Sequence, residues 1–240
     1  QRQMCIRDRN TTGENNNAFG RGALVTNTTS NNLNAFGDYA LQANTTGTES
    51  SAFGHRALYS TTTGGYNNAF GAFALYANTT GAANCAFGAY ALNTVTTASN
   101  NTAMGSEALR NNTTGANNTA VGANALDSNT EGTNTVAIGY GALTAQNTGG
   151  TNTGVGYNAL AACTVGYYSA AFGAYAGDNM TTGHSNTYIG DNAGNTHATG
   201  YGCTIIGRAS NTSGTAVNLE TVIGHSLTCL LYTSDAADES

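Results

Sequence analysis

Residues 67–83 read NNAFGAFALYANTTGAA and residues 84–100 read NCAFGAYALNTVTTASN, so one 17-residue pattern occurs twice in succession. The same spacing extends through most of the chain, where a glycine recurs at positions 20, 37, 54, 71, 88, 105, 122, 139, 156, 173, 190, 207 and 224. Equal repeats without insertions are typical of solenoids, in which each copy stacks on the copy before it.

Two apolar columns accompany these glycines. The residue before each glycine is large and apolar, from Phe19 to Ile223, and we predict that this column forms a core ladder. The second column is leucine, always preceded by alanine, and it runs from Leu24 to Leu160. Each copy therefore supplies two apolar clusters for burial between stacked turns.

The last copies change character together. Gly177 and Gly194 replace the leucine, while the alanine that precedes the first apolar column enlarges to Tyr188, Ile205 and Val222. The volume lost from one column is thus regained in another. We expect a transition in the core near the carboxyl end of the repeats.

Each copy is predicted to contain strand, bend, strand and turn, with the turn at polar strings such as NTTG (44–47). Seventeen residues are too few for a helix pair, and apolar residues do not recur at helical spacing. We therefore predict an all-β fold, a parallel β-solenoid (β-roll) of about thirteen 17-residue turns over residues 10–228. The ends, QRQMCIRDR (1–9) and CLLYTSDAADES (229–240), resemble translated sequencing adapters and are interpreted as artefactual tails.

The composition argues against several functional classes. The formal net charge is −6 and lysine is absent, so no basic patch is predicted and nucleic acid is not an expected partner. No run of 18 apolar residues occurs, so we expect no membrane insertion of residues 10–228. A thin core of two large apolar side chains per turn makes association with further copies attractive.

The strings NTAVG (118–122), TVAIG (135–139), TIIG (204–207) and TVIG (221–224) resemble the head repeats of YadA-type trimeric autotransporter adhesins. Similar Asn- and Thr-rich repeats occur in phage tail-fibre-like proteins. The resemblance implies a left-handed β-roll, a homotrimer, and a host-surface or extracellular-matrix ligand. It also implies an extracellular location, on a cell surface with an outer-membrane anchor elsewhere in the full-length protein, or on a virion.

The expected homotrimer needs a contact face. The alanine preceding the large apolar residue, as at Ala35, Ala52 and Ala69, alternates with it along the strand and is small enough for close approach. We therefore predict trimer packing through this alanine face.

No catalytic, cofactor-binding or metal-binding residue is predicted, and the chain is not expected to be an enzyme or to need a cofactor. GVGYNA (154–159) fits a dinucleotide pattern only because the repeat creates it, and no helix is expected after it. The four histidines, His55, His184, His197 and His225, share no motif with an acid or nucleophile. Cys85, Cys163 and Cys203 lack metal or disulfide spacing and are interpreted as small apolar residues.

Two polar columns carry alternative hypotheses. The asparagines of the NTT strings (Asn10, Asn27, Asn44, Asn78 and Asn112) match glycosylation acceptors, but turn geometry explains their fixed position. The threonine that follows recurs from Thr11 to Thr215 and raises the possibility of an ice-binding ladder, although neighbouring Thr-Thr side chains diverge in a strand.

The positions after each repeated glycine differ most between copies. They include Asp38, Tyr39, His55, Arg56, Phe73, Tyr90, Glu107, Tyr140, Tyr157 and Tyr175. A recognition surface is predicted there, with a tolerant loop as the alternative. The sequence thus favours a surface adhesin or fibre head, with a phage tail-fibre shaft or an ice-binding solenoid as alternatives.

Overall fold

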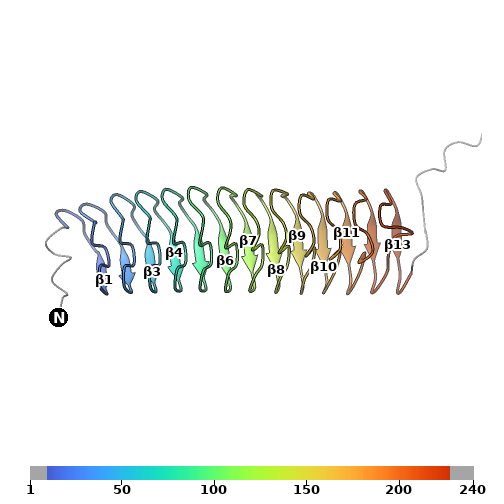
Figure 1. The fold of residues 1–240 in the computed structure, drawn as a ribbon, viewed down its shortest axis with the longest axis horizontal. Helices are drawn as coiled ribbons and strands as arrows, with labels where there is room; N and C mark the ends of the chain where they lie inside the picture. The colour runs from blue at the N-terminus through green and yellow to red at the C-terminus, as the bar shows by residue number, and fades with distance from the viewer. Residues whose placement is uncertain (1–9, 228–240) are drawn as a thin grey trace, which may run out of the picture. The chain divides into compact units, whose positions relative to one another are not determined.

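The computed structural model describes residues 10–227, and this part is a parallel β-solenoid of about 12 turns with about 17 residues per turn. It contains thirteen short strands and no helix among the described residues. Figure 1 shows one strand per turn, with successive strands in chain order. The all-β solenoid prediction is confirmed, whereas the two tails assigned to residues 1–9 and 229–240 lie outside the described residues.

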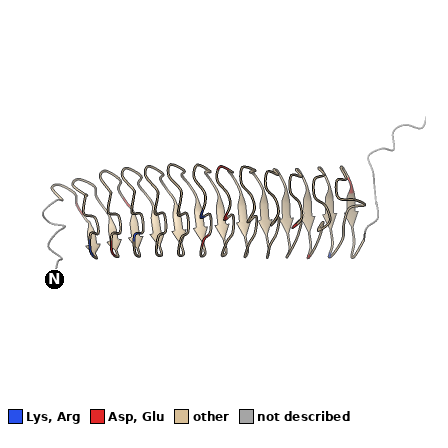
Figure 2. Ribbon diagram, viewed as in Figure 1, with Lys and Arg blue, Asp and Glu red and all other residues tan. Residues whose placement is uncertain are grey.

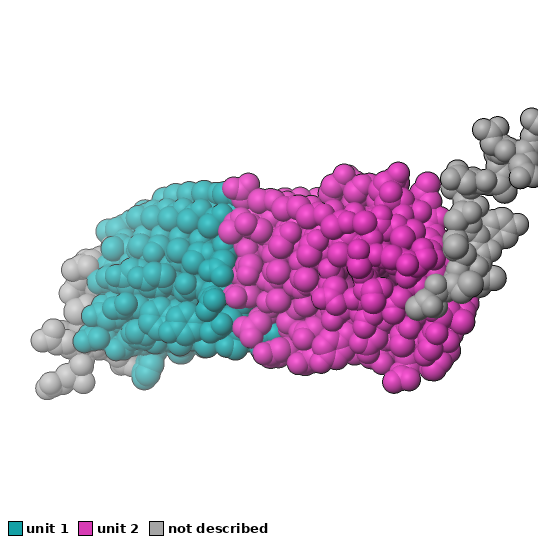
Figure 3. Space-filling model, turned by 45° about the vertical axis from the view of Figure 1, so that its right-hand side comes forward, with its two compact units in different colours: residues 1–123 teal, residues 124–240 magenta. Residues whose placement is uncertain are grey.

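The chain divides into two compact units, residues 1–123 and 124–240 (Figure 3). The first holds β1 (Asn17–Phe19), β2 (Asn34–Phe36), β3 (Ser51–Phe53), β4 (Asn68–Phe70), β5 (Cys85–Phe87), β6 (Thr102–Met104) and β7 (Thr119–Val121). Consecutive strands in this unit pair in parallel with no change of register, so Ala52 pairs with Ala69 and Phe53 with Phe70.

The second unit holds β8 (Val136–Ile138), β9 (Thr153–Val155), β10 (Ala170–Phe172), β11 (Thr187–Ile189), β12 (Thr204–Ile206) and β13 (Thr221–Ile223). Its strands pair in the same way, so Tyr188 pairs with Ile205 and Ile189 with Ile206. In both units the constant offset of one repeat places like residues above one another.

The core has the opposite orientation to the one predicted. The alanine at the centre of each strand in the first unit from β2 onward is fully buried, whereas Phe36 and Phe53 are 39% and 36% exposed. Because side chains alternate across a strand, only one of the two columns can face inward. The leucine column already fills much of each turn, with Leu41 and Leu58 at 0% exposure, so the space left beside it fits alanine.

The predicted second strand in each copy is also wrong. The leucines lie in turns with left-handed backbone, as at Leu41 (φ 50°) and Leu75 (φ 51°). This conformation is costly for a branched side chain, and burial of the leucine offsets the cost. The turn still bonds to its neighbour, since the Leu58 amide donates to the Ala74 carbonyl at 3.0 Å.

The repeated glycine is required by close approach of the backbone. Gly54 has φ 140°, and a Cβ there would lie 2.5 Å from the Gly71 carbonyl oxygen. A side chain would separate the two turns at this point. The 17-residue spacing of the glycines therefore marks a close backbone contact in each turn.

Buried asparagines connect the turns of the first unit. The Asn84 Oδ1 accepts from the Asn101 amide at 3.0 Å, and the Asn84 Nδ2 donates to the Ala98 carbonyl at 2.8 Å. Asn67 and Asn101 make the equivalent bonds to the copies that follow them. These amides satisfy backbone groups of turns that contain only three strand residues.

The predicted core transition near the carboxyl end is confirmed. Tyr188 is fully buried, and a Cβ on Gly177 would lie 2.6 Å from its ring. A Cβ on Gly194 would overlap the other edge of the same ring. The two glycines therefore provide the volume that the tyrosine occupies.

Candidate functional site

The third residue of every strand points outward and forms what we call the apolar ladder. In the first unit, the Phe36, Phe53, Phe70 and Phe87 rings stack with centroid separations of 4.8, 4.8 and 4.5 Å. Their planes differ by 5° or less, so the rings form one continuous stack. An exposed apolar strip of this kind is typical of an interaction surface.

The apolar ladder of the second unit is largely aliphatic. Ile138 and Ile189 are each 40% exposed, and Ile223 is 52% exposed. The first residue of a strand faces the same side as the third, and in β11, β12 and β13 this residue is threonine. The outer face of these three strands therefore pairs a hydroxyl column with an isoleucine column.

The positions after the repeated glycines form a second surface in the first unit, which we call the aromatic corner. It comprises Tyr39, His55, Arg56, Tyr59, Phe73, Tyr76 and Tyr90. The Phe73 and Tyr90 rings stack at 5.1 Å, and the Arg56 guanidinium carbon lies 5.5 Å from the centre of the Tyr59 ring. The predicted variable positions are thus brought together, and sequence analysis missed Tyr59 and Tyr76, which lie three residues further along their copies.

The second unit carries two further aromatic groups. Tyr140 and Tyr157, which are 17 residues apart, stack at 5.5 Å, and Tyr175, 18 residues after Tyr157, meets it edge-on at 5.1 Å. His184 lies between Tyr167 and Tyr201, at 4.8 and 5.1 Å, with its ring nearly parallel to both. Sequence analysis missed this second stack, although the three residues are 17 positions apart.

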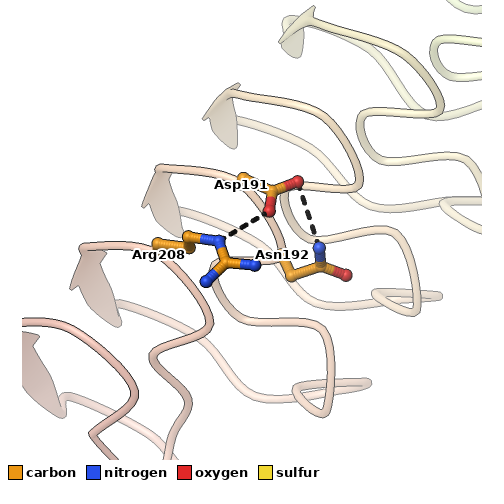
Figure 4. Close-up of polar contacts among 3 residues, drawn as sticks. All are labelled: Asp191, Asn192 and Arg208. Atoms are coloured by element: carbon orange, nitrogen blue, oxygen red, sulfur yellow. Dashed lines mark hydrogen bonds and ion pairs between the residues drawn. The ribbon is translucent and has the colours of Figure 1, made fainter.

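Charges are sparse among the described residues (Figure 2), and two arginines pair with a carboxylate of an adjacent turn. The Arg208 Nε donates to the Asp191 Oδ2 at 3.2 Å, and the other Asp191 oxygen accepts from Asn192 at 3.1 Å (Figure 4). Arg21 and Asp38 approach to 3.5 Å in the same way. These exposed pairs contribute little to stability and mainly fix side-chain positions.

A buried polar pair lies in the core transition. The Tyr188 hydroxyl donates to the His197 Nδ1 at 2.6 Å, because the His197 Nε2 carries the proton that it donates to the Val217 carbonyl at 2.9 Å. Burial lowers the pKa of His197 and raises the pKa of Tyr188. Both groups are therefore held neutral, and no nucleophile is paired with them.

The polar columns of the repeat are structural. The side chains of Asn27, Asn44 and Asn78 are buried and donate to the carbonyl three residues later, at 3.3, 3.0 and 3.0 Å, so the turn interpretation is confirmed. The threonine that follows bonds to the next turn, as when the Thr45 hydroxyl donates to the Thr62 carbonyl at 2.9 Å. That hydroxyl is already engaged and does not offer a free ordered donor to solvent.

The dinucleotide-like pattern and the cysteines form no common site among the described residues. GVGYNA (154–159) begins in β9 and continues into turns without a helix. Cys85, Cys163 and Cys203 are free thiols, and burial raises the pKa of Cys163 to about 11. Between residues 10 and 227, no group of three or more His, Cys, Asp or Glu side chains is placed to hold a metal ion.

Fold and surface together define a parallel β-solenoid repeat protein with an exposed apolar ladder and an aromatic corner. Searches against protein-family models, curated protein sequences and solved structures found no match to this chain. Within the described residues, no helix has the length and apolar character needed to cross a membrane.

Proposed function

We propose that this chain is a non-enzymatic surface module, an adhesin head or fibre segment, that presents a repetitive binding surface outside the cell or on a virion. The aromatic groups at the positions after the repeated glycines carry this proposal, because they recur in both units and expose ring surface, as at Tyr90 and Tyr157. Such a surface suits many weak contacts whose strength comes from repetition. A phage tail-fibre shaft uses the same features and is kept as the alternative context.

The expected homotrimer has a different contact face from the one predicted. The prediction that copies pack through the alanine face is wrong, because Ala35, Ala52 and Ala69 are fully buried within their own turns. The apolar ladder replaces it in the proposal, since Phe36 and Phe53 expose ring surface that a second and third copy would remove from water. Stacked rings from several copies would form a shared core of the kind found in obligate interfaces.

Light scattering coupled to size-exclusion chromatography tests the assembly. The expected mass is three times the 24.3 kDa of one chain. Replacing Phe36, Phe53 and Phe70 with serine is expected to yield monomers whose circular dichroism is unchanged, because these side chains lie outside the core. A monomeric starting protein, or a serine variant that stays trimeric, contradicts the proposed interface.

Ice binding is a second candidate, through a different threonine column of the second unit from the predicted Thr11–Thr215 ladder. The hydroxyls of Thr187, Thr204 and Thr221 have no protein hydrogen-bond partner, and each strand also carries an outward isoleucine. Regular hydroxyl and methyl columns spaced by about 4.8 Å are suited to ordering water. Thermal hysteresis that disappears in a Thr187→Lys, Thr204→Lys variant would favour this function over adhesion.

A further inference from the structure

Arg56 differs from the other arginines of the described chain in lacking an acidic partner. Arg21, Arg110 and Arg208 each lie within 4.0 Å of a carboxylate oxygen, whereas Arg56 has no ion pair. Its only assigned polar contact is the backbone bond from its amide to the Asp38 carbonyl at 2.9 Å. A guanidinium without an anion, in a protein of net charge −6, needs a physical explanation.

Aromatic rings surround this guanidinium. Its central carbon lies 5.5 Å from the Tyr59 ring centre, 5.8 Å from Tyr39 and 6.0 Å from Phe73. Cation–π contacts at these distances hold the group in place without neutralising its charge. The Nε atom is buried and has no hydrogen-bond partner, so part of the donor fork is unused.

The neighbouring surface offers apolar ring area. Phe73 lies one turn beyond Arg56, and Tyr90, which is 42% exposed, stacks on it. Tyr90 therefore places a ring face and a phenol hydroxyl two turns beyond Arg56. Tyr39 lies one turn before it, at the ring distance given above. A fixed cation among half-buried and exposed aromatic rings combines the two features that bind an acidic sugar, a charge for the anionic group and ring faces for the pyranose carbon–hydrogen bonds.

We propose that the aromatic corner is a binding site for an acidic saccharide, with Arg56 donating to its carboxylate or sulfate and the rings of Tyr39 and Tyr90, on either side of Arg56, contacting neighbouring sugar units. This inference deepens the proposed function, on which it rests, by naming the ligand class. One unpaired cation fits one anionic group per few sugar units. A nucleic acid strand fits less well, because its dense phosphates would meet the net negative charge of the chain.

Titration of the full chain with three probes tests the site, read by tyrosine fluorescence because tryptophan is absent. The probes are hyaluronan oligosaccharides for the carboxylate, keratan sulfate oligosaccharides, which contain no uronic acid, for the sulfate, and neutral chitin oligosaccharides as the control. We expect binding of at least one acidic probe, roughly tenfold or more tighter than the neutral one and weakened by salt. Single-stranded DNA serves as a fourth probe, and preferential binding of DNA overturns the proposal.

Matched variants assign the effect to Arg56. R56Q is expected to weaken acidic-saccharide binding by about tenfold or more, and R56K, which keeps the charge but loses the planar fork, by less. R208Q removes an arginine that already pairs with Asp191 and is expected to bind within about twofold of the parent chain. Thermal unfolding of each variant reports its stability separately.

Several outcomes overturn the saccharide site. They are equal binding of acidic and neutral probes, no binding of either, or equal losses in R56Q and R208Q. If R56Q fails to fold, R56K decides the question, since unchanged affinity in that folded variant contradicts recognition through the guanidinium fork. The trimer mass and its dependence on the apolar ladder are measured independently, so failure of this site is distinguishable from failure of the proposed function.

Discussion

The Tyr188 hydroxyl and the His197 imidazole form a 2.6 Å hydrogen bond inside the core of the second unit, and His197 in turn donates to the Val217 carbonyl. Neither nitrogen of this imidazole faces a free acceptor for a second proton. The charge of Glu220 favours the protonated imidazole and raises the pKa of His197, but burial, which lowers that pKa, has the larger effect. The folded state therefore favours the neutral form of the His197 imidazole.

Acidification is predicted to destabilise the second unit through this pair. Burial lowers the pKa of His197 in the fold, so below the ordinary histidine pKa of about 6.5 the unfolded chain binds more protons than the folded chain. Stability is thus complete above that pH and falls as the pH decreases below it. Thermal unfolding followed at pH 7.5 and pH 5.5 measures the loss. H197N, which restores the asparagine common at this repeat position, is expected to reduce the difference, and an unchanged pH dependence in H197N contradicts the assignment.

Gly177 leaves the space that the Tyr188 ring fills, so we predict that changing both residues together is less destabilising than the two single changes imply. Gly177→Leu alone is expected to destabilise the fold by about 1–3 kcal/mol or more, because its Cβ would already lie 2.6 Å from the Tyr188 ring. Tyr188→Ala alone leaves a cavity and is expected to cost about 3–5 kcal/mol. The double variant restores the alanine and leucine of earlier copies and should recover much of the loss in urea unfolding. Additive losses would contradict the compensation.

The reversed orientation of the strands predicts opposite results at adjacent positions. Ala86→Leu is expected to destabilise the first unit by about 1–3 kcal/mol, because Ala86 is fully buried. Phe87→Ser is expected to change stability little and to weaken self-association, since Phe87 is 38% exposed. Denaturant unfolding at low protein concentration compares the two. A larger loss of unfolding free energy in Phe87→Ser than in Ala86→Leu would contradict the buried alanine column and support a core built from phenylalanine.

The buried asparagines are predicted to be essential to the first unit. Asn84→Ala leaves the Asn101 amide and the Ala98 carbonyl without their partner, and this is expected to cost about 1–3 kcal/mol for each unsatisfied group. Thr97→Ala, at a neighbouring exposed position, is the control and is expected to change stability by less than about 0.5 kcal/mol. Similar melting temperatures for the two variants would contradict this role.

The tyrosines of the second unit test surface recognition. Replacing Tyr140, Tyr157 and Tyr175 with serine is expected to weaken binding to host cells or matrix without unfolding, because all three are exposed. Binding to immobilised matrix proteins and circular dichroism provide the two readouts. Unchanged binding supports the alternative that these positions form a tolerant loop.

The repeat length, the parallel solenoid and the core transition could all be predicted from the sequence, because each depends only on which residues recur every 17 positions. The direction in which each column points could not. Periodicity is the same for the alanine and phenylalanine columns, and size favours phenylalanine for a core. The inside of the turn is set instead by the leucine column, whose positive-φ turn conformation no local pattern revealed.

In the candidate site, too, the sequence predicts which positions recur but not which side chains meet within a turn. Within each unit, several of the variable positions after the glycines lie in contact, as the repeat spacing predicts. The contribution of Tyr59 to the surroundings of Arg56 depends instead on how the turn folds back. Tyr188 and His197 are nine residues apart and meet only because Gly177 and Gly194 leave room between them. Such contacts depend on the three-dimensional course of one turn, which the spacing of repeats does not specify.

The unchanging register of the paired strands has a consequence for how a chain of this design can vary. Deleting or duplicating one whole copy keeps each outward apolar side chain above another and each buried asparagine level with the same position of the next turn. Losing a single residue within a copy, by contrast, shifts all later columns by one and turns outward side chains inward. Changes in length that keep the fold therefore come in multiples of 17 residues, and the number of repeated surface positions can change without a new core.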